Sequence, residues 1–156
     1  MKLRASMSLS LLLLGAALSV GRGARADRAP SIDRAHVTVS VAGLRSDRGA
    51  VRCIAYDGPE RFPEGNQRVI ARVSARPAGA SATCEFAGLP RGRDIAVVIH
   101  HDENDDRVFQ RGVFGIPLEG YGFSNDARPI LAAPSFDACK FRPLGERWSV
   151  RITARY

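Results

Sequence analysis

Motifs that mark the common catalytic and metal sites are missing from this 156-residue chain. Its three cysteines form no C-x-x-C pair and no cluster with its three histidines, which excludes the usual structural zinc sites. No G-x-S-x-G turn, H-E-x-x-H helix or phosphate-binding glycine loop occurs either. The sequence motifs therefore do not identify a reaction.

Long apolar runs are also scarce, and the single one lies near the N-terminus. Lys2 and Arg4 precede an uncharged, leucine-rich run over residues 9–20, and Ala24 and Ala26 supply the small residues that a signal peptidase reads. The pattern predicts a cleavable signal peptide, residues 1–26, with cleavage after Ala26. An uncleaved short anchor is the alternative.

No second apolar run follows, and the first is short for a bilayer core of about 30 Å, which takes about 20 apolar residues to cross. We therefore expect no membrane span, and a mature protein that is periplasmic or secreted. Residues 27–35 are expected to form a flexible N-terminal segment, and residues 36–156 a single domain.

Charge of one sign is not concentrated in the mature chain. The formal net charge is +7, from 23 basic and 16 acidic residues, and removing residues 1–26 takes away four basic residues and no acidic one, which leaves +3. Arginines and acids then alternate without a basic block, which argues against nucleic-acid binding. The expected partner is an envelope protein or a surface ligand.

Period-two alternation of apolar and polar residues dominates the rest of the chain, as in half-buried strands, and glycine- and proline-rich turns separate the segments. We expect an all-β antiparallel sandwich of about seven strands, with a barrel as the competing architecture. Strands are expected over residues 36–41, 50–56, 68–75, 81–86, 94–101, 136–141 and 148–156.

The cysteines would reach an oxidising compartment, where paired thiols persist as disulfides. Cys53 and Cys84 each alternate with apolar residues on an expected strand, so both side chains point inward. We predict a Cys53–Cys84 disulfide, which leaves Cys139 over. Three buried thiols are the alternative.

Acids and glycines crowd one connection, residues 100–125, directly after an apolar strand. Loops of this kind often carry function. Glycines and aromatics in it predict either an exposed apolar patch for a partner, formed by Phe114, Tyr121 and Phe123, or a cap on the open end of the sandwich. The predicted binding residues are His101, Asp102, Glu103, Asn104, Glu119, Tyr121 and Phe123.

A catalytic interpretation of this loop needs its histidines and carboxylates to meet. His100, His101, Asp102, Glu103 and Glu119 have the side chains of general acid-base chemistry. In an extended strand, however, His100 and His101 point to opposite faces. We therefore favour a non-catalytic binding or structural module with no assigned catalytic residue. A small periplasmic hydrolase that uses His101, Asp102 and Glu103 is the alternative.

Four segments carry a resemblance to a known family. They are Leu89-Pro90-Arg91-Gly92, His101-Asp102-Glu103-Asn104, residues 115–125 and Pro134-Ser135-Phe136-Asp137-Ala138. Together they resemble the bacterial family known as domain of unknown function 2141, from about His36 to Tyr156. The resemblance implies an exported single domain, with a strand order similar to transthyretin-like or carboxypeptidase-regulatory-like sandwiches.

The family pattern also raises the question of calcium. Members tend to read D-x-N-x-N-G-x-x-D in this loop, which is similar to calcium-binding loops whose alternate oxygens converge on one cation. Asp102, Asn104 and Asp106 keep the ligand positions, whereas Arg107 and Gln110 replace the turn glycine and a later aspartate. Because of these departures we interpret the segment as an acidic turn whose side chains bond backbone amides. The calcium site of an adhesion-type domain, which the family pattern implies, is the alternative.

Overall fold

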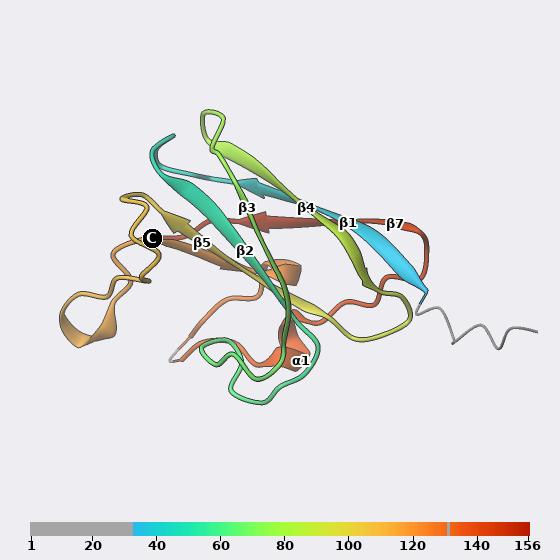
Figure 1. The fold of residues 1–156 in the computed structure, drawn as a ribbon. Coiled ribbons are helices and arrows are strands. Elements are labelled where there is room, and N and C mark those ends of the chain that lie inside the picture. Colours follow the sequence, from blue (N-terminus) through green and yellow to red (C-terminus); the bar gives the residue numbers. More distant parts are fainter. Residues whose placement is uncertain (1–32, 131) are drawn as a thin grey trace, which may run out of the picture. The chain divides into compact units, whose positions relative to one another are not determined.

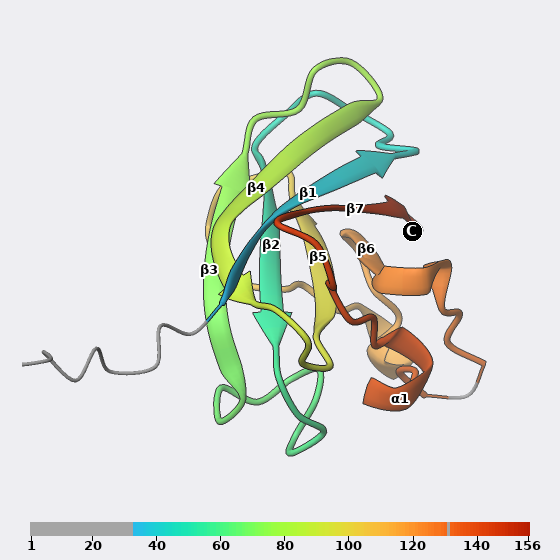
Figure 2. The same ribbon diagram turned by 90° about the vertical axis from the view of Figure 1, so that its right-hand side faces the viewer.

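The computed structural model describes residues 33–130 and 132–156, in which seven strands form two β-sheets. The three-stranded sheet has the order β4-β1-β7, and the four-stranded sheet has the order β3-β2-β5-β6. The two sheets pack face to face (Figure 1, Figure 2). The strands are β1 Arg34–Ala42, β2 Ala50–Tyr56, β3 Val69–Ala75, β4 Ser81–Pro90, β5 Ala96–Asp102, β6 Gly120–Phe123 and β7 Arg147–Thr153.

The interior between the sheets follows from the alternation in the sequence. In β1, Val37, Val39 and Val41 are buried, and the residues between them are less buried or exposed. They pack against inward side chains of the opposite sheet, among them Val97 and Ile99. Each buried aliphatic side chain contributes about 1.5 to 3 kcal/mol to folding, so this layer holds the domain together. The predicted all-β sandwich is confirmed.

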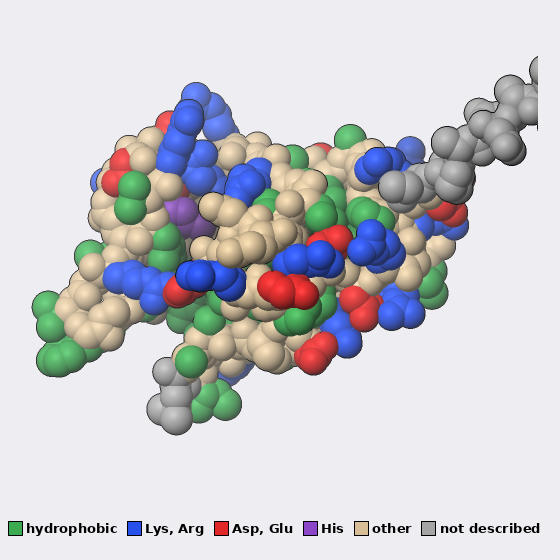
Figure 3. All heavy atoms as spheres, turned by 60° about the horizontal axis from the view of Figure 1, so that its bottom comes forward, with side chains coloured by type: hydrophobic (Ala, Val, Ile, Leu, Met, Phe, Trp, Pro, Cys, Tyr) green, Lys and Arg blue, Asp and Glu red, His purple; other side chains and the backbone are tan. Residues whose placement is uncertain are grey.

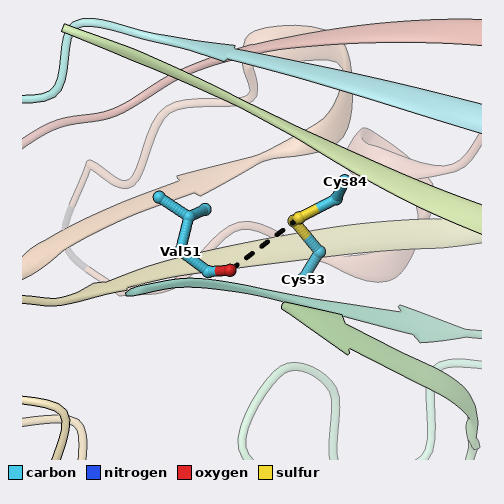
Figure 4. Close-up of a disulfide and its surroundings, with 3 residues drawn as sticks. All are labelled: Val51, Cys53 and Cys84. Carbon is cyan, nitrogen blue, oxygen red and sulfur yellow. Dashed lines mark hydrogen bonds between the residues drawn. A yellow bond between two sulfur atoms is a disulfide. The ribbon is translucent and has the colours of Figure 1, made fainter. Parts of the chain in front are cut away.

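The predicted Cys53–Cys84 disulfide is present, and it joins the two sheets (Figure 4). Cys53 lies on β2 and Cys84 on β4, and their Cα atoms are 6.5 Å apart. Both side chains lie in the core because they alternate with outward residues. Cys139 is buried and free.

Three expectations about strands are corrected. Residues 136–141 were expected to extend, but Phe136–Cys139 form the helical turn α1, in which the Ser135 side chain accepts a hydrogen bond from the Ala138 amide at 3.2 Å. The three-residue spacing of Phe136 and Cys139 suits a helical turn, which buries both side chains. The sequence prediction missed β6, and β7 pairs with β1 in parallel rather than antiparallel orientation.

A second apolar cluster covers one end of the outer face of the four-stranded sheet. Tyr56, Phe123 and Phe136 belong to it, and the ring of Phe62 lies edge-on to Tyr56 and Phe136 with centroids 5.1 and 5.7 Å away. The other end of this face carries polar side chains. One end of the outer face is thus covered by apolar side chains, and the polar end is the candidate site.

The predicted signal peptide, residues 1–26 with cleavage after Ala26, and most of the segment 27–35 lie outside the described residues. Within the described part, no helix has the length and apolar character needed to cross a membrane.

Candidate functional site

A row of three polar residues crosses the uncovered end of the four-stranded sheet. Arg52 on β2 pairs with His100 on β5, which in turn pairs with Tyr121 on β6. These residues alternate with the core residues Cys53 and Ile99, so their side chains lie on the outer face. Pairing of the strands therefore brings together residues that are far apart in the sequence.

His100 forms a close pair with a buried carboxylate. Its Nε2 lies 2.7 Å from Oε2 of Glu119, whose side chain is only 5% exposed. The same carboxylate accepts hydrogen bonds from the backbone amides of Glu103, at 3.3 Å, and Gln110, at 3.1 Å. The ring of Phe109 lies edge-on to the imidazole, with centroids 5.1 Å apart. Glu119 and Phe109 thus fix the orientation of the imidazole.

His101 lies on the other face, in the interior. Its Nδ1 lies 2.6 Å from the Tyr156 hydroxyl and its Nε2 lies 3.0 Å from the Arg48 carbonyl oxygen. The residue is completely buried, and both ring nitrogens have partners. The His101 side chain therefore has a structural arrangement and does not reach the site around His100.

Glu103, another predicted binding residue, also points away from His100. Its carboxylate accepts hydrogen bonds from Arg45 and, at 2.6 Å, from the Ser46 hydroxyl. The hydrogen bond from Arg45 lowers the pKa of Glu103 to about 2, against the opposing effect of burial. The carboxylate is therefore ionised at neutral pH and holds the segment around Arg45 against the end of β5.

Asp102 anchors the start of the acidic loop. Its fully buried carboxylate accepts hydrogen bonds from Arg52 Nε at 2.6 Å, from the Arg107 amide at 2.9 Å and from the Asp106 amide at 3.1 Å. Burial acts to raise the pKa of Asp102, but the bonds from Arg52 and Arg107 outweigh it, and the pKa lies below its ordinary value. Arg52 also pairs with Asp105 and so joins two acids of the loop.

The three predicted calcium ligands lie in one tight turn. Asn104 Oδ1 accepts a hydrogen bond from the Asp106 amide at 3.2 Å, and Asp106 Oδ1 accepts one from the Val108 amide at 2.8 Å. The bond from Val108 is the largest cause of a lowered pKa at Asp106. Side-chain oxygens of Asp102, Asn104 and Asp106 thus bond backbone amides of the turn. Calcium binding here remains a prediction.

A second set of potential metal ligands is formed by His100, Asp102 and Glu119, which each offer a donor atom within 4.8 Å of the others. Imidazole and carboxylate donors suit zinc and similar ions. Here, however, the Arg52 guanidinium contacts Asp102, and a cation next to it would be repelled. The donor set therefore fits the cationic side chain that is present better than it fits a metal ion.

An open groove with a volume of about 1430 Å³ lies over this face of the sheet. In Figure 3, basic side chains in blue and hydrophobic side chains in green border a hollow in which histidine atoms are visible in purple. Among the residues that the structure describes, four arginines but only one carboxylate line the groove, together with His100 and five aromatic residues. These charged and aromatic residues are Arg52, Arg72, Arg107, Arg111, Glu64, Tyr56, Phe109, Phe114, Tyr121 and Phe123.

The three aromatics of the predicted patch have different environments. Phe123 is buried in the second apolar cluster, Tyr121 is half-buried on the wall of the groove, and Phe114 is 96% exposed at its rim. Capping and exposure thus both occur. Gly122 is required by space, because a Cβ atom there would lie 2.6 Å from the Ile152 side chain, and Gly115 has a φ of +75°.

Sequence reasoning missed the arginines as a group. Arg72 and Arg107 are 35 positions apart, and only the folded chain places both at one groove. The available signal was the alternation on β2 and β3, which puts Arg52 and Arg72 on the face opposite the core residues. On the sequence alone, such a row is equally typical of a solvated face.

The family model described as "Uncharacterized protein conserved in bacteria (DUF2141)" matches residues 39–149. No curated protein matches the chain, and no solved structure does.

Proposed function

The chain belongs to the bacterial family DUF2141, as its loop motif indicated, and we propose that it is an exported binding module that takes an organic anion into the groove of its four-stranded sheet. The proposed export rests on the basic residues, apolar run and small residues at the N-terminus. The proposed ligand rests on the excess of arginine over carboxylate in the groove.

Ion pairing within the protein leaves part of this positive charge for a ligand. Arg52 is offset by Asp102 and Asp105, and Arg111 pairs with Glu64 at 2.5 Å. Among the residues that the structure describes, no carboxylate forms an ion pair with the two remaining arginines of the groove, Arg72 and Arg107. Arginine forks match the oxygens of carboxylate, sulfate and phosphate groups, so these two side chains suit an anion.

The walls of the groove suit an apolar part of the same ligand. Tyr121 and Phe109 lie close together, with ring centroids 6.3 Å apart, and Phe109 also lies against the His100 ring. Binding sites for small molecules combine aromatic walls with a few placed polar groups, and the groove has both. An anion with a flat apolar body fits this combination best.

A pair of fluorescent dyes tests the proposal. Anilinonaphthalene sulfonate carries one sulfonate, and N-phenylnaphthylamine has the same rings without a charge. We expect the mature protein to bind the sulfonate more tightly. The double variant Arg72→Gln/Arg107→Gln is expected to lose about tenfold in affinity for the sulfonate and little for the neutral dye.

The control variant is Arg147→Gln/Arg151→Gln, which removes the same charge from exposed positions of β7 on the other sheet. It should bind both dyes as the parent does. Equal losses in the two double variants would show that only overall charge matters and would reject the groove as the site.

Export is tested separately by N-terminal sequencing of the protein released by osmotic shock. The proposal expects a mature chain that starts at Asp27. An intact precursor retained in the cytosol would contradict it, whatever the dye measurements show.

An enzyme is the second candidate, and the His100–Glu119 pair favours it. A histidine held by a buried carboxylate at the wall of a groove is equipped to move a proton. Any such chemistry would use His100 rather than His101, which is enclosed in the core. Hydrolysis of p-nitrophenyl acetate that is lost in His100→Gln and kept in His36→Gln would support it, since His36 is exposed and pairs with Glu85.

A further inference from the structure

We infer that the hairpin of residues 110–118 is a membrane-docking tip, which inserts its apolar end into a lipid surface that carries anionic headgroups. Phe114 and Arg107 also line the groove, but docking of the tip requires no ligand there. The hairpin is ordered, its apolar side chains are exposed and arginines lie near its base.

The hairpin is held by its own backbone hydrogen bonds. The Leu118 amide donates to the Gln110 carbonyl at 3.0 Å, and the Gly112 amide donates to the Ile116 carbonyl at 2.8 Å. A short 3-10 turn, Val113–Gly115, forms the end, which projects away from both sheets (Figure 1). Insertion of such a preformed tip costs less conformational entropy than insertion of an unstructured loop.

Every side chain at the end of the hairpin is apolar, and most are exposed. Val113 is 75% exposed, Phe114 is 96% exposed and Ile116 is 60% exposed. The sequence from Gly112 to Leu118 contains no polar side chain. Large exposed apolar groups gathered in one place mark a surface that is covered when the protein acts.

The backbone at Phe114 adds to this observation. Its φ of 60° lies in the left-handed region, which a bulky residue rarely adopts. Glycine or asparagine would fit this position without the steric cost, yet the chain carries its most exposed aromatic side chain here. The strained turn presents the ring outward at the far end of the hairpin.

Two arginines follow the apolar end toward the body of the protein. Arg107 is exposed and forms no ion pair with a described carboxylate, whereas Arg111 pairs with Glu64 at 2.5 Å and lies over the Phe109 ring, 5.2 Å from its centroid. Arginine side chains beside an inserted apolar tip lie at the level of lipid phosphates. The hairpin thus ends in apolar side chains, and basic side chains lie between this end and the body of the protein (Figure 3). This arrangement complements an anionic bilayer surface.

The shape of the tip favours a lipid surface over a protein partner. A specific protein interface needs about 800 Å² of complementary surface on each side. A narrow convex hairpin offers a few side chains at its end, whereas a fluid bilayer adapts to such a tip without a complementary shape. The tip therefore suits a lipid surface.

Co-sedimentation of the mature protein with vesicles tests the inference. We expect binding to vesicles of phosphatidylglycerol and phosphatidylcholine, and weaker binding to phosphatidylcholine alone. Phe114→Asn keeps a residue that tolerates the left-handed backbone and removes the ring, and it should lower the partition coefficient by about tenfold or more. Val113→Ser should act in the same direction.

Leu144→Asn is the matched control, because Leu144 is also apolar and is 66% exposed at a distant loop. It should bind vesicles as the parent does. Parent protein that stays in the supernatant, or equal binding by Phe114→Asn, would overturn the inference. Equal binding to both kinds of vesicle would overturn its anionic part.

Failure of the tip and failure of the groove can be told apart. Val113 does not line the groove, so Val113→Ser should lose vesicle binding and keep the affinity for anilinonaphthalene sulfonate. Sedimentation velocity adds one more outcome. A dimer that disappears in Phe114→Asn, without vesicle binding by the parent, would assign the tip to a second copy of the chain and reject lipid.

Discussion

His100 and His101 are neighbours in the sequence, but their rings bond different partners on opposite faces of β5. The Nε2 atom of His100 lies 2.7 Å from Glu119 at the groove, and Nδ1 of His101 lies 2.6 Å from the Tyr156 hydroxyl in the interior. One histidine is thus available to a ligand, and the other belongs to the packing. Substitutions on the two faces should therefore have separable effects.

Tyr156→Phe should destabilise the protein by about 1 to 2 kcal/mol, because it leaves a ring nitrogen of the buried His101 without its partner. The same hydroxyl also accepts a hydrogen bond from the Arg45 amide at 3.0 Å. Urea unfolding gives the free energy. Tyr121→Phe is the control, since the Tyr121 hydroxyl bonds no other described residue, and a loss there as large as in Tyr156→Phe would contradict the explanation.

Replacing Cys53 and Cys84 together by alanine should cost about 3 to 4 kcal/mol, because the disulfide closes a loop of 31 residues and so limits the unfolded chain. Thermal unfolding with and without a reductant measures the effect. The reductant should destabilise the parent and leave the double variant unchanged. If the reductant leaves the melting temperature of the parent unchanged, the disulfide does not stabilise the protein as expected.

The thiol of Cys139 should be unreactive in the folded protein. It is fully buried, and burial raises its pKa to about 11, so both access and the thiolate form are lacking at neutral pH. Titration with 5,5′-dithiobis(2-nitrobenzoate) should find no reactive thiol in the native state and one per chain in guanidinium. Rapid labelling before unfolding would show that α1 opens easily.

Acid should destabilise the protein partly through Glu103. The pKa of its carboxyl is about 2 in the folded state against an ordinary 4.5, so its stabilisation is complete above the higher value and is lost as pH falls toward the lower one. We expect a contribution of about 2 kcal/mol, reduced by the exposure of Arg45. Glu103→Gln should lose less stability than the parent between these two pH values, and identical slopes would exclude this role.

The two interpretations of the acidic turn predict different effects of calcium on stability. In the first interpretation, the carboxylates of the turn bond only backbone amides and Arg52. Asp102→Asn should then lower the free energy of unfolding by about 2 to 3 kcal/mol, because it removes a buried partner of Arg52. The loss should be the same with and without millimolar calcium. Melting temperatures give the comparison. A rise in the parent on adding calcium, absent in Asp102→Asn, would instead establish the calcium site.

Local patterns predicted much of the fold. Alternation located most strands, and the inward positions of Cys53 and Cys84 gave the disulfide. Phe136 was misassigned because a short apolar segment fits a strand as well as a helical turn, and only the cap at Ser135 distinguishes them. β6 was missed because glycines, which weaken strands, are kept there for close packing.

The site was less predictable, because it depends on contacts between distant segments. Tyr121 and Glu119 were identified from the loop and do lie beside His100. His101 and Glu103 were identified with them, yet the alternation that makes a strand sends these two side chains to the opposite side. The role of Arg72 follows only from the pairing of β3 with β2.

The parallel contact between β1 and β7 has a consequence for how the polypeptide acquires its shape. His36 pairs with Arg147, 111 positions later, so the opening strand of the sandwich gains its second neighbour from the closing one. Closing so large a loop makes folding slow, and the domain cannot complete its fold before β7, its last strand, has been synthesised. Until β7 has been synthesised, β1 can pair with β4 alone.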